Sequence, residues 1–416
     1  MTLSWLQALP DSADGSAIGS ALLPEPNDTV TLLPHAAIAW RSGRFVRVEA
    51  LPGLPPPGAP LLLPGLVDLH VHWPQWHVRG QFSGQLLPWL RDAIWPAEAE
   101  FADVPFARAR AQDFAAAAVR AGTCAGLLFG PPFAAASVAA ITALSRGFVE
   151  GPALMEQHCP LNLASDPVGL LAQLVAQAPG HMFAITPRFA PNVSAAALRA
   201  CGHMAAQTGW PVQSHLSENL DEVRWVRELF AEARDYTDVY DAAGLLGQRS
   251  IFAHAVHCSD RELSRLAETG TWIAHCPTSN VALGSGRMPV ERVAAAGVPW
   301  VLATDVGAGP QLSQLDVMRT FFAVHRGHAA VSAGQALCRS TAVPGTFLAA
   351  LDPQLQGLGT IAVGAPAHLV AVPCPAPKPT AEAMLQSLLH AMPAHVEQYA
   401  QAVVQWGQLA FASAAG

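Results

Sequence analysis

Short apolar runs alternate with longer helix-like stretches from residue 65 to residue 304, and this alternation narrows the possible folds more than any other feature of the chain. Strands that alternate with helices pair side by side in a parallel sheet. Eight such units within about 240 residues are the number that closes a (β/α)8 barrel. The expected strands are Gly65–Leu69, Gly122–Phe129, Gly151–Met155, Met182–Thr186, Val212–His215, Ser250–His254, Trp272–His275 and Trp300–Thr304.

The segments between these runs have the length and apolar spacing of helices. Two further helices are expected after the last strand, at Ser313–His328 and Ser332–Arg339. The helices expected between the strands are Phe106–Ala121, Ala195–Thr208, Asp221–Ala233, Asp260–Thr269 and Met288–Ala296.

Both ends of the chain depart from this pattern. Residues 37–50 predict a hairpin that turns at Ser42 and Gly43, and a proline-rich stretch then leads into the first barrel strand. Strand-like character returns at 357–364 and 367–372, whereas 397–411 fits either a final hairpin or an amphipathic helix. We therefore expect an α/β fold: a distorted (β/α)8 TIM-like barrel over residues 64–358, with a small β-sandwich-like domain assembled from residues 1–63 and 359–416.

The composition excludes several classes of protein. Charged residues make up 13% of the chain and hydrophobic residues 51%, which favours a globular protein over a disordered one. The net charge is −8 and no run of basic residues is present, which argues against binding to nucleic acid. The seven cysteines include no CxxC pair, which indicates reduced thiols and a cytoplasmic location. Residues Met1–Trp5 carry no basic leader, and the uncharged stretch Ala121–Ser145 is broken by Gly130, so we expect neither a signal peptide nor a membrane span.

His70 and His72 are the first candidates for chemistry. If residues 67–72 form a strand, both side chains lie on the same face, because side chains alternate along a strand. Two neighbouring imidazoles are half of a site for zinc or iron(II). On their own, they are equally well explained as two unrelated histidines in a strand.

Polar residues also stand at the ends of the other expected strands. The carboxyl ends of barrel strands gather at one face, which is where active sites of such barrels form. Buried imidazoles and carboxylates need partners, and a shared cation would supply them. The residues concerned are Thr186, Arg188, Phe189, His215, Glu218, His254, His275, Cys276, Thr304 and Asp305.

Several stretches, in this order along the chain, resemble the amidohydrolase superfamily and, within it, the members that deaminate guanine. Each stretch alone is a weak signal, whereas the set is specific. The resemblance covers roughly residues 60–310, and the stretches are PGLVDLHVHWPQ (64–75), LPWLRDAIWPAEAEF (87–101), TPRF (186–189), QSHLSENLDEV (213–223), YTDVYDAAGLLG (236–247), FAHAVHCS (252–259), IAHCPTSN (273–280) and TDVGAG (304–309).

The resemblance implies a hydrolase with one metal ion per subunit, usually Zn²⁺ and alternatively Fe²⁺. The metal ligands that it implies are His70, His72, His215 and Asp305. Members with two metals carry a bridging lysine at the end of the fourth strand. Arg188 stands there in this chain, so one metal is expected.

The resemblance also implies the reaction, which is the hydrolysis of guanine to xanthine and ammonia, a step of purine catabolism and salvage. A metal lowers the pKa of bound water to about 7 and so gives a hydroxide nucleophile at neutral pH. Glu218 would then carry a proton to the ring nitrogen, as a general acid and base. Asp305 would pass the proton of the water to the leaving amine, and His254 would be the partner of that water.

Gln75, Arg188 and Phe189 are the expected readers of the base, alongside His215, Glu218 and His254. A glutamine offers both a donor and an acceptor to a purine edge, an arginine donates to a carbonyl oxygen, and a phenylalanine stacks on a flat ring. Simpler roles stay open for three of them. Glu218 could cap the helix that follows, Arg188 could neutralise a carboxylate, and Phe189 could be part of the pocket wall.

Two alternatives to guanine deamination remain. One is a deaminase of another amino-heterocycle (a triazine, cytosine or an oxidised guanine) on the same mononuclear site. The other is a non-catalytic scaffold that keeps the barrel, against which the intact ligand positions and Glu218 argue. The expected partners are guanine and water, with no nucleic acid and no membrane, and the resemblance implies a homodimer.

Overall fold

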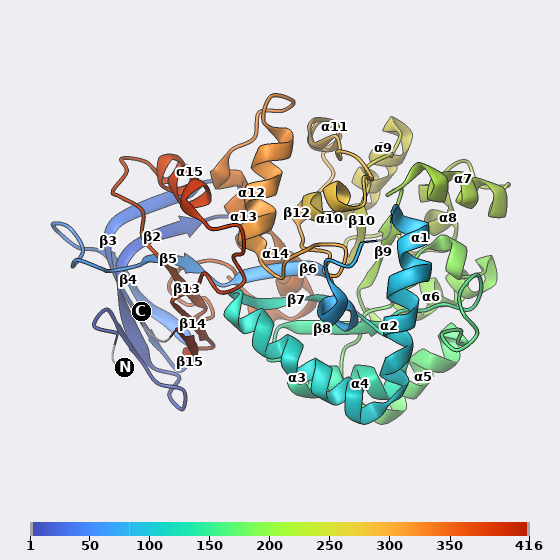
Figure 1. Ribbon diagram of the computed structural model, residues 1–416, viewed down its shortest axis with the longest axis horizontal. Helices are drawn as coiled ribbons and strands as arrows, with labels where there is room; N and C mark the ends of the chain where they lie inside the picture. Colours follow the sequence, from blue (N-terminus) through green and yellow to red (C-terminus); the bar gives the residue numbers. More distant parts are fainter. Residues whose placement is uncertain (1–2, 83, 414–416) are drawn as a thin grey trace.

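The computed structural model describes residues 3–82 and 84–413, so Met1 and Thr2 of the N-terminal segment lie outside the described residues. Its centre is a ring of parallel strands surrounded by helices (Figure 1). One three-stranded sheet has the order β6-β7-β8, and one four-stranded sheet has the order β12-β11-β10-β9. These strands are β6 (Leu66–His72), β7 (Thr123–Gly130), β8 (Phe148–Pro152), β9 (Val212–Leu216), β10 (Ser250–His254), β11 (Trp272–His275) and β12 (Trp300–Leu302).

The fourth expected strand, Met182–Thr186, is wrong as a regular strand, although its segment joins the two sheets. Ile185 forms an isolated parallel bridge with Val212 on one side, and Pro187 forms one with Leu154 on the other. Pro187 has no N–H to donate, which interrupts a regular ladder at this position. The third strand begins at Phe148 rather than at Gly151, so that prediction was displaced along the chain.

The ring is closed between the first and the last strand. The Asp305 backbone N–H donates to the His70 carbonyl at 2.9 Å, and the His72 N–H donates to the Val306 carbonyl at 2.6 Å. With these bonds the two sheets and the bridging segment complete a distorted barrel, as the sequence predicts. The closure also places the residue after β12 directly beside the end of β6.

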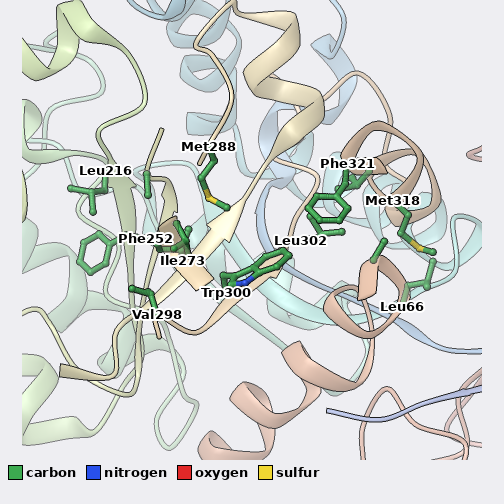
Figure 2. Packing of buried hydrophobic residues seen from close by; sticks show 14 of the residues in the cluster. Leu66, Leu216, Phe252, Ile273, Met288, Val298, Trp300, Leu302, Met318 and Phe321 are labelled. Carbon is green, nitrogen blue, oxygen red and sulfur yellow. The ribbon is translucent and has the colours of Figure 1, made fainter. Parts of the chain in front are cut away.

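Successive side chains of the barrel strands face different layers of the core. Ile251 and Ala253 belong to one buried cluster, which contains many small residues, while Phe252 belongs to the cluster packed against the surrounding helices. Figure 2 shows this second cluster, in which Trp300 of β12 lies beside Phe321 of α12. Their ring centroids are 5.6 Å apart.

The helices expected between the strands are present, with small differences at their ends. Asp221–Ala233 is shorter than predicted, because its helix ends at Leu229. Helices that the sequence analysis did not assign lie at Leu86–Ala99, Ala342–Leu351 and Ala381–Ala391. The α-helices from residue 104 onward are α3 (Val104–Arg120), α4 (Ala134–Ala143), α5 (Pro167–Gln177), α6 (Ala195–Thr208), α7 (Leu220–Leu229), α8 (Tyr236–Ala242), α9 (Asp260–Thr269), α10 (Pro277–Ala282), α11 (Val290–Ala295), α12 (Gln314–His325), α13 (Ala333–Arg339), α14 (Ala342–Leu351) and α15 (Ala381–Ala391).

A short helical segment after β6 covers the carboxyl end of the barrel. It begins with the 3-10 turn η1 at Trp73–Val78 and continues from Leu86 to Ala102. Leu90–Ile94 forms a turn of π-helix within it, a form that often occurs at functional sites. The parts are α1 (Leu86–Trp89), η2 (Leu90–Ile94), α2 (Trp95–Ala99) and η3 (Glu100–Ala102), and two further 3-10 turns are η4 (Ala190–Asn192) and η5 (Pro353–Leu355).

Both ends of the chain meet in one eight-stranded sheet, with the order β15-β14-β13-β5-β2-β3-β4 and with β1 paired to β2. In Figure 1 its blue N-terminal strands and dark red C-terminal strands lie side by side. The domain limits at residues 63 and 358 stay a prediction. The strands are β1 (Leu6–Ala8), β2 (Gly15–Pro24), β3 (Val30–Arg41), β4 (Arg44–Ala50), β5 (Leu61–Pro64), β13 (Leu369–Val372), β14 (Ala402–Gln405) and β15 (Gln408–Ala412).

Turns within this sheet settle two of the expectations. The hairpin of β3 and β4 turns at Ser42 and Gly43, as predicted, and both residues have a positive φ. The final segment is a hairpin rather than a helix and turns at Trp406 and Gly407. Residues 357–364 are turns rather than the expected strand, because the glycines at 357, 359 and 364 adopt positive φ angles that no strand contains.

Strand β5 passes into β6 through a single residue, Gly65. A Cβ atom at this position would lie 2.4 Å from Cys124 Sγ and 2.7 Å from His368 Cβ, so only glycine fits. Its N–H donates to the His368 carbonyl at 3.0 Å. The sheet therefore continues directly into the strand that carries His70 and His72. Within the described residues, none of the helices combines the length and the apolarity needed to cross a membrane.

Candidate active site

Four side chains converge at the carboxyl end of the barrel, from three different strand positions. His70 and His72 lie on β6, His215 lies on β9, and Asp305 follows β12. Each offers one ligand atom, and these four atoms all lie within 4.8 Å of one another. The Nε2 atoms of His70 and His72 are 3.3 Å and 3.4 Å from the same oxygen, Asp305 Oδ1. The two histidines thus share a face, as the alternation of the strand predicts.

Three imidazoles and one carboxylate are a donor set that suits zinc and other divalent transition metals. The Nε2 atom of His70 is buried and has no hydrogen-bond partner among the described residues, which is the state expected of a nitrogen that faces an ion. His72 Nε2 lies 3.1 Å from His215 Nε2, so these nitrogens also point to one place. The residues therefore fit a metal ion that all four side chains share.

Neighbouring groups fix the orientation of the rings. The Nδ1 of His215 lies 2.5 Å from the Arg188 carbonyl oxygen, which makes Nδ1 the protonated nitrogen and leaves Nε2 free for a metal. The carboxylate of Asp305 accepts a hydrogen bond from Ser279 Oγ at 2.5 Å. Nδ1 of His254 lies 2.9 Å from Asn280 Oδ1, which turns its Nε2 toward the site.

Burial sets the charge states of the ligand residues. It lowers the pKa of His72 to about 3 and holds the pKa of His215 well below its usual value. Both rings are therefore neutral at pH 7, which is the form that binds a metal. Burial raises the pKa of Asp305, but its contacts with His70 and His72 outweigh this effect and hold the pKa well below the ordinary value. Asp305 is thus a carboxylate.

The backbone at the strand ends is unusual. Asp305, His254, Ala255 and Ser217 have φ angles of 50°, 75°, 49° and 48°, although none of them is glycine. Left-handed non-glycine residues are costly and gather at functional sites. At Ala255 an alanine adopts this left-handed conformation.

Glu218 lies beside this group, on the loop between β9 and α7. Its Oε1 accepts a hydrogen bond from Ser285 Oγ at 3.0 Å, and its Oε2 lies 3.4 Å from His254 Nε2. Burial, together with the negative charge of Asp305, raises the pKa of Glu218 to about 8. A carboxyl group with this pKa carries a proton at neutral pH and can also give it up.

The helix cap after Glu218 is made by other residues. Asn219 is the N-cap of α7, and Glu222 returns hydrogen bonds to the backbone N–H groups of Glu218 and Asn219 at 2.9 and 3.1 Å. The capping role that the sequence left open for Glu218 therefore belongs to Asn219 and Glu222. The Glu218 side chain stays directed into the site.

A pocket with about 390 Å³ of empty space opens over the four converging side chains. One side is apolar, because the helical segment after β6 supplies Leu86, Trp89 and Leu90. The expected substrate-reading residues Gln75, Arg188 and Phe189 all line the pocket, as do His72, His215, Glu218, His254 and Asp305. The mixed apolar and polar lining suits a small flat heterocycle.

Glu98 is a residue of this site that the sequence analysis missed. Its Oε1 accepts a hydrogen bond from Gln75 Nε2 at 2.8 Å, and its Oε2 pairs with Arg188 Nη1 at 2.7 Å. All three side chains are buried. Arg188 thus does neutralise a carboxylate, which was the simpler role considered for it, and it lines the pocket as well. The signals in the sequence were a single acidic residue within the apolar stretch 94–99 and its place in the family-like stretch 87–101.

His275 and Cys276 lie next to the site without belonging to the four-residue group. His275 Nε2 is 2.9 Å from His325 Nε2 of α12, and both side chains are buried. Cys276, together with His254 and Asp305, forms a second group whose ligand atoms lie within 4.8 Å of one another. This group shares Asp305 with the first.

The chain was compared with known families, curated proteins and solved structures. The model of the Amidohydrolase family matches residues 61–396. The probable guanine deaminase of Deinococcus radiodurans is 41% identical over 267 residues, which are 61% of this chain and 60% of that protein. The guanine deaminase of Escherichia coli strain K12 is 34% identical over 275 residues, or 64% and 62% of the two chains. These matches span less than two thirds of the relatives' own length.

Solved structures agree over a longer part of the chain. The E. coli guanine deaminase superposes with a TM-score of 0.85 at 25% identity and covers 95% of this chain and 99% of its own. A guanine deaminase from C. acetobutylicum, solved with guanine bound in its active site, has a TM-score of 0.83 at 23% identity, with the same coverage, and supports the fold. The family model covers most of the chain, and the barrel with its His and Asp cluster agrees with it: the chain belongs to the amidohydrolase family.

Proposed function

We propose that this protein is a guanine deaminase, which hydrolyses guanine to xanthine and ammonia in purine catabolism and salvage. The observation that carries the proposal is that one pocket is lined by Glu218, by Gln75, Arg188 and Phe189, and by three members of a four-residue group that could hold a metal ion. Curated relatives named guanine deaminases, 34–41% identical in sequence, support the substrate.

In this proposal His70, His72, His215 and Asp305 hold one Zn²⁺ per subunit, with Fe²⁺ as the alternative metal. When bound, a divalent ion supplies Lewis acidity that makes water a nucleophile at neutral pH. Metal analysis of the purified protein is expected to give one equivalent per chain. Reloading the chelated protein with Zn²⁺ or Fe²⁺ and comparing the rates would then distinguish the two metals.

Glu218 and Asp305 divide the proton transfers between them. Glu218 is protonated at neutral pH and gives its proton to the ring nitrogen next to the carbon that carries the amine. Asp305, held as a carboxylate, takes a proton from the attacking water and passes it to the amine. The C–N bond then breaks, ammonia leaves, and the remaining proton of the added hydroxyl returns to Glu218 as the carbonyl of xanthine forms. His254 Nε2, 3.4 Å from Glu218 Oε2 and 3.8 Å from Asp305 Oδ2, lies between the two acids and orients the water.

Gln75 and Arg188 hold the polar edge of the base, and Phe189 packs against the ring. His215 and His254 line the same pocket, so the substrate contacts the group that does the chemistry. The apolar side formed by Trp89 and its neighbours excludes water from the opposite face of the ring. This exclusion strengthens the hydrogen bonds that select the substrate.

Purified, metal-loaded protein incubated with guanine tests the proposal, with ammonia and xanthine as readouts. Release of both supports it. Ammonia from a triazine, cytosine or an oxidised guanine, but none from guanine, would replace the substrate with another amino-heterocycle. No ammonia from any of them would favour a non-catalytic scaffold. The homodimer and the cytoplasmic location stay predictions, and light scattering on the eluting protein tests the first of them.

A further inference from the structure

Glu98 connects the two polar readers of the pocket and contributes nothing to the metal group. It lies on α2, and its two carboxylate oxygens each take one partner, Gln75 Nε2 at 2.8 Å and Arg188 Nη1 at 2.7 Å. Glu98 is 1% exposed and does not line the pocket, so it acts on a ligand only through Gln75 and Arg188.

The network fixes which way the Gln75 amide points. An amide oxygen and nitrogen are hard to distinguish by shape, so their positions follow from the partners. The Gly307 N–H can only donate, and it donates to Gln75 Oε1 at 3.2 Å. The Glu98 carboxylate can only accept, so the group that faces it is the Gln75 NH₂ group, which donates a hydrogen bond to Glu98 Oε1. The reverse orientation would set two donors against each other and two acceptors against each other.

The consequence is that the readers offer hydrogen-bond donors to the pocket. One N–H of Gln75 is used by Glu98 and one remains, and the guanidinium of Arg188 keeps the N–H groups that Glu98 does not use. A base edge with two acceptors matches such a pair. In guanine, O6 and N7 are neighbouring acceptors, whereas an amino group in place of O6 turns one of them into a donor.

We propose that Glu98 is a positioning residue that sets Gln75 as a donor, holds Arg188 beside it, and so makes the pocket select bases with a carbonyl oxygen at the six-position. The inference rests on the proposed function, because it names the substrate feature that this same site reads. Glu98 does not touch the substrate. It acts by fixing the amide orientation of Gln75 and the position of the Arg188 guanidinium.

Replacing Glu98 by glutamine changes this arrangement while keeping the shape of the side chain. Glu98→Gln leaves one acceptor oxygen for two donors, and its new NH₂ group must face either Gln75 or Arg188. Gln75 can relieve the conflict only by turning its amide, which would then set its NH₂ group against the Gly307 N–H. Every arrangement loses at least one hydrogen bond, and the turned amide offers an acceptor to the pocket.

The experiment compares guanine as substrate with 2,6-diaminopurine as competitive inhibitor, in which an amine replaces the carbonyl oxygen. Wild-type protein, Glu98→Gln and the control Glu100→Gln, an exposed carboxylate two residues away, are measured with bound metal and melting temperature recorded. In Glu98→Gln we expect the KM for guanine to rise at least about tenfold, with a smaller change in kcat. We expect the ratio of the diaminopurine Ki to the guanine KM to fall by a similar factor. Glu100→Gln should match the wild type.

If folded, metal-loaded Glu98→Gln has the same ratio of diaminopurine Ki to guanine KM as the wild type, the proposal is overturned, even if activity and stability fall. A merely structural role would weaken the binding of both purines together and leave this ratio unchanged. If Glu98→Gln does not fold, Glu98→Asp keeps two acceptors but sets them back by one methylene. For Glu98→Asp, a ratio of the diaminopurine Ki to the guanine KM that lies between the wild-type value and one then supports the proposal. A ratio equal to the wild-type value overturns it. Failure of the wild type to deaminate guanine would instead overturn the proposed function, so the two failures are distinct.

Discussion

At the scale of single residues, a substitution of Glu218 tests the proposed chemistry separately from metal binding. It lies against Ser285 and His254 but outside the four-residue group. We expect Glu218→Gln to lower kcat by about 10²–10⁴-fold, because the amide cannot carry the proton, while the bound metal stays at the wild-type level. Ammonia release and metal analysis on the same sample measure both. The control Glu228→Gln, on the exposed face of α7, should be fully active, and loss of metal from Glu218→Gln would refute its role as a proton carrier.

A second prediction concerns His368, far from the barrel mouth. It is buried against Trp406, with ring centroids 4.8 Å apart, and neither ring nitrogen has a hydrogen-bond partner among the described residues. Burial lowers the pKa of His368 to about 3, against 6.5 for an ordinary histidine. The folded state thus binds fewer protons than the unfolded state between these values. Stability from this residue is complete above pH 6.5 and falls as the pH drops toward 3.

His368→Leu removes this acid sensitivity. Between pH 6.5 and pH 4.5 the histidine costs the wild type about 2–3 kcal/mol of unfolding free energy, which the leucine variant should retain. Urea unfolding of both proteins at pH 7 and pH 4.5 gives the difference. His203→Leu, on the exposed side of α6, serves as the control and should lose as much stability as the wild type. Equal losses in wild type and His368→Leu would show that the ring is not buried uncharged.

The convergence of the site residues could be predicted because each stands at or just after the carboxyl end of a strand with a recognisable apolar pattern, whereas their roles came from the family resemblance. His70, His72, His215, His254 and Asp305 all stand at such ends. The groups that orient them could not be predicted in the same way. Asn280, Ser285 and Glu98 come from helices and loops whose approach to the site depends on tertiary packing. An acidic residue in an apolar helix is a signal that a partner exists, but it does not name the partner.

At the scale of elements, α6 packs against the chain at the end of α8 through a glycine. A Cβ atom at Gly202 would lie 1.9 Å from the Ala243 carbonyl oxygen, and Gly202 is buried. A glycine-to-alanine change in a helix normally stabilises it by roughly 0.5–1 kcal/mol. Here we expect Gly202→Ala to destabilise the protein by about 1–3 kcal/mol, because α6 must move away from that carbonyl.

Thermal and urea unfolding measure this effect. Gly334→Ala on α13 is the matched control, since the atoms nearest to its Cβ would lie 3.4 Å away, at an ordinary contact distance. The control should change stability little. A stabilised Gly202→Ala would mean that the two helices are not in close contact.

The spacing of apolar residues predicted most strands and helices of the barrel. Where these predictions are wrong, the cause is local. The segment 182–186 is apolar like a strand, yet Pro187 limits it to isolated bridges. Residues 357–364 also look strand-like, but three glycines with positive φ make turns of them. Strand β2 was not assigned, because its many small residues resemble a loop in composition. It becomes a strand by pairing with β3 and β5, which the local sequence does not encode.

At the scale of the whole molecule, Arg339 ties the sheet to the barrel. Its guanidinium binds Asp28 in the turn between β2 and β3, through contacts of 2.9 and 2.6 Å, and donates to the Trp300 carbonyl at 2.9 Å. It also lies over the Trp300 ring at 4.5 Å. We expect Arg339→Met to lower the unfolding free energy by about 1–3 kcal/mol, because three partners in a largely buried place lose their bonds.

Arg292→Met is the matched control for that measurement. Its ion pair with Asp260 is exposed and bonds no other element of the core. Such pairs contribute less than about 1 kcal/mol. Urea unfolding should therefore separate the two variants, and equal effects would mean that Arg339 does not join the two parts.

The single-residue passage from β5 through Gly65 into β6 has a consequence for biosynthesis. Strand β5 pairs with β13, so Leu61–Pro64 is held on that side only after residues 369–372 have left the ribosome. Contacts that are so distant in sequence form late. The two histidines of β6 can pair with β7 and with residues 305–306 before that point, so β13 adds the last anchor of the strand that leads into them. Nascent chains stalled before residue 369 should retain zinc more weakly than chains stalled after residue 412, when both are washed with a chelator.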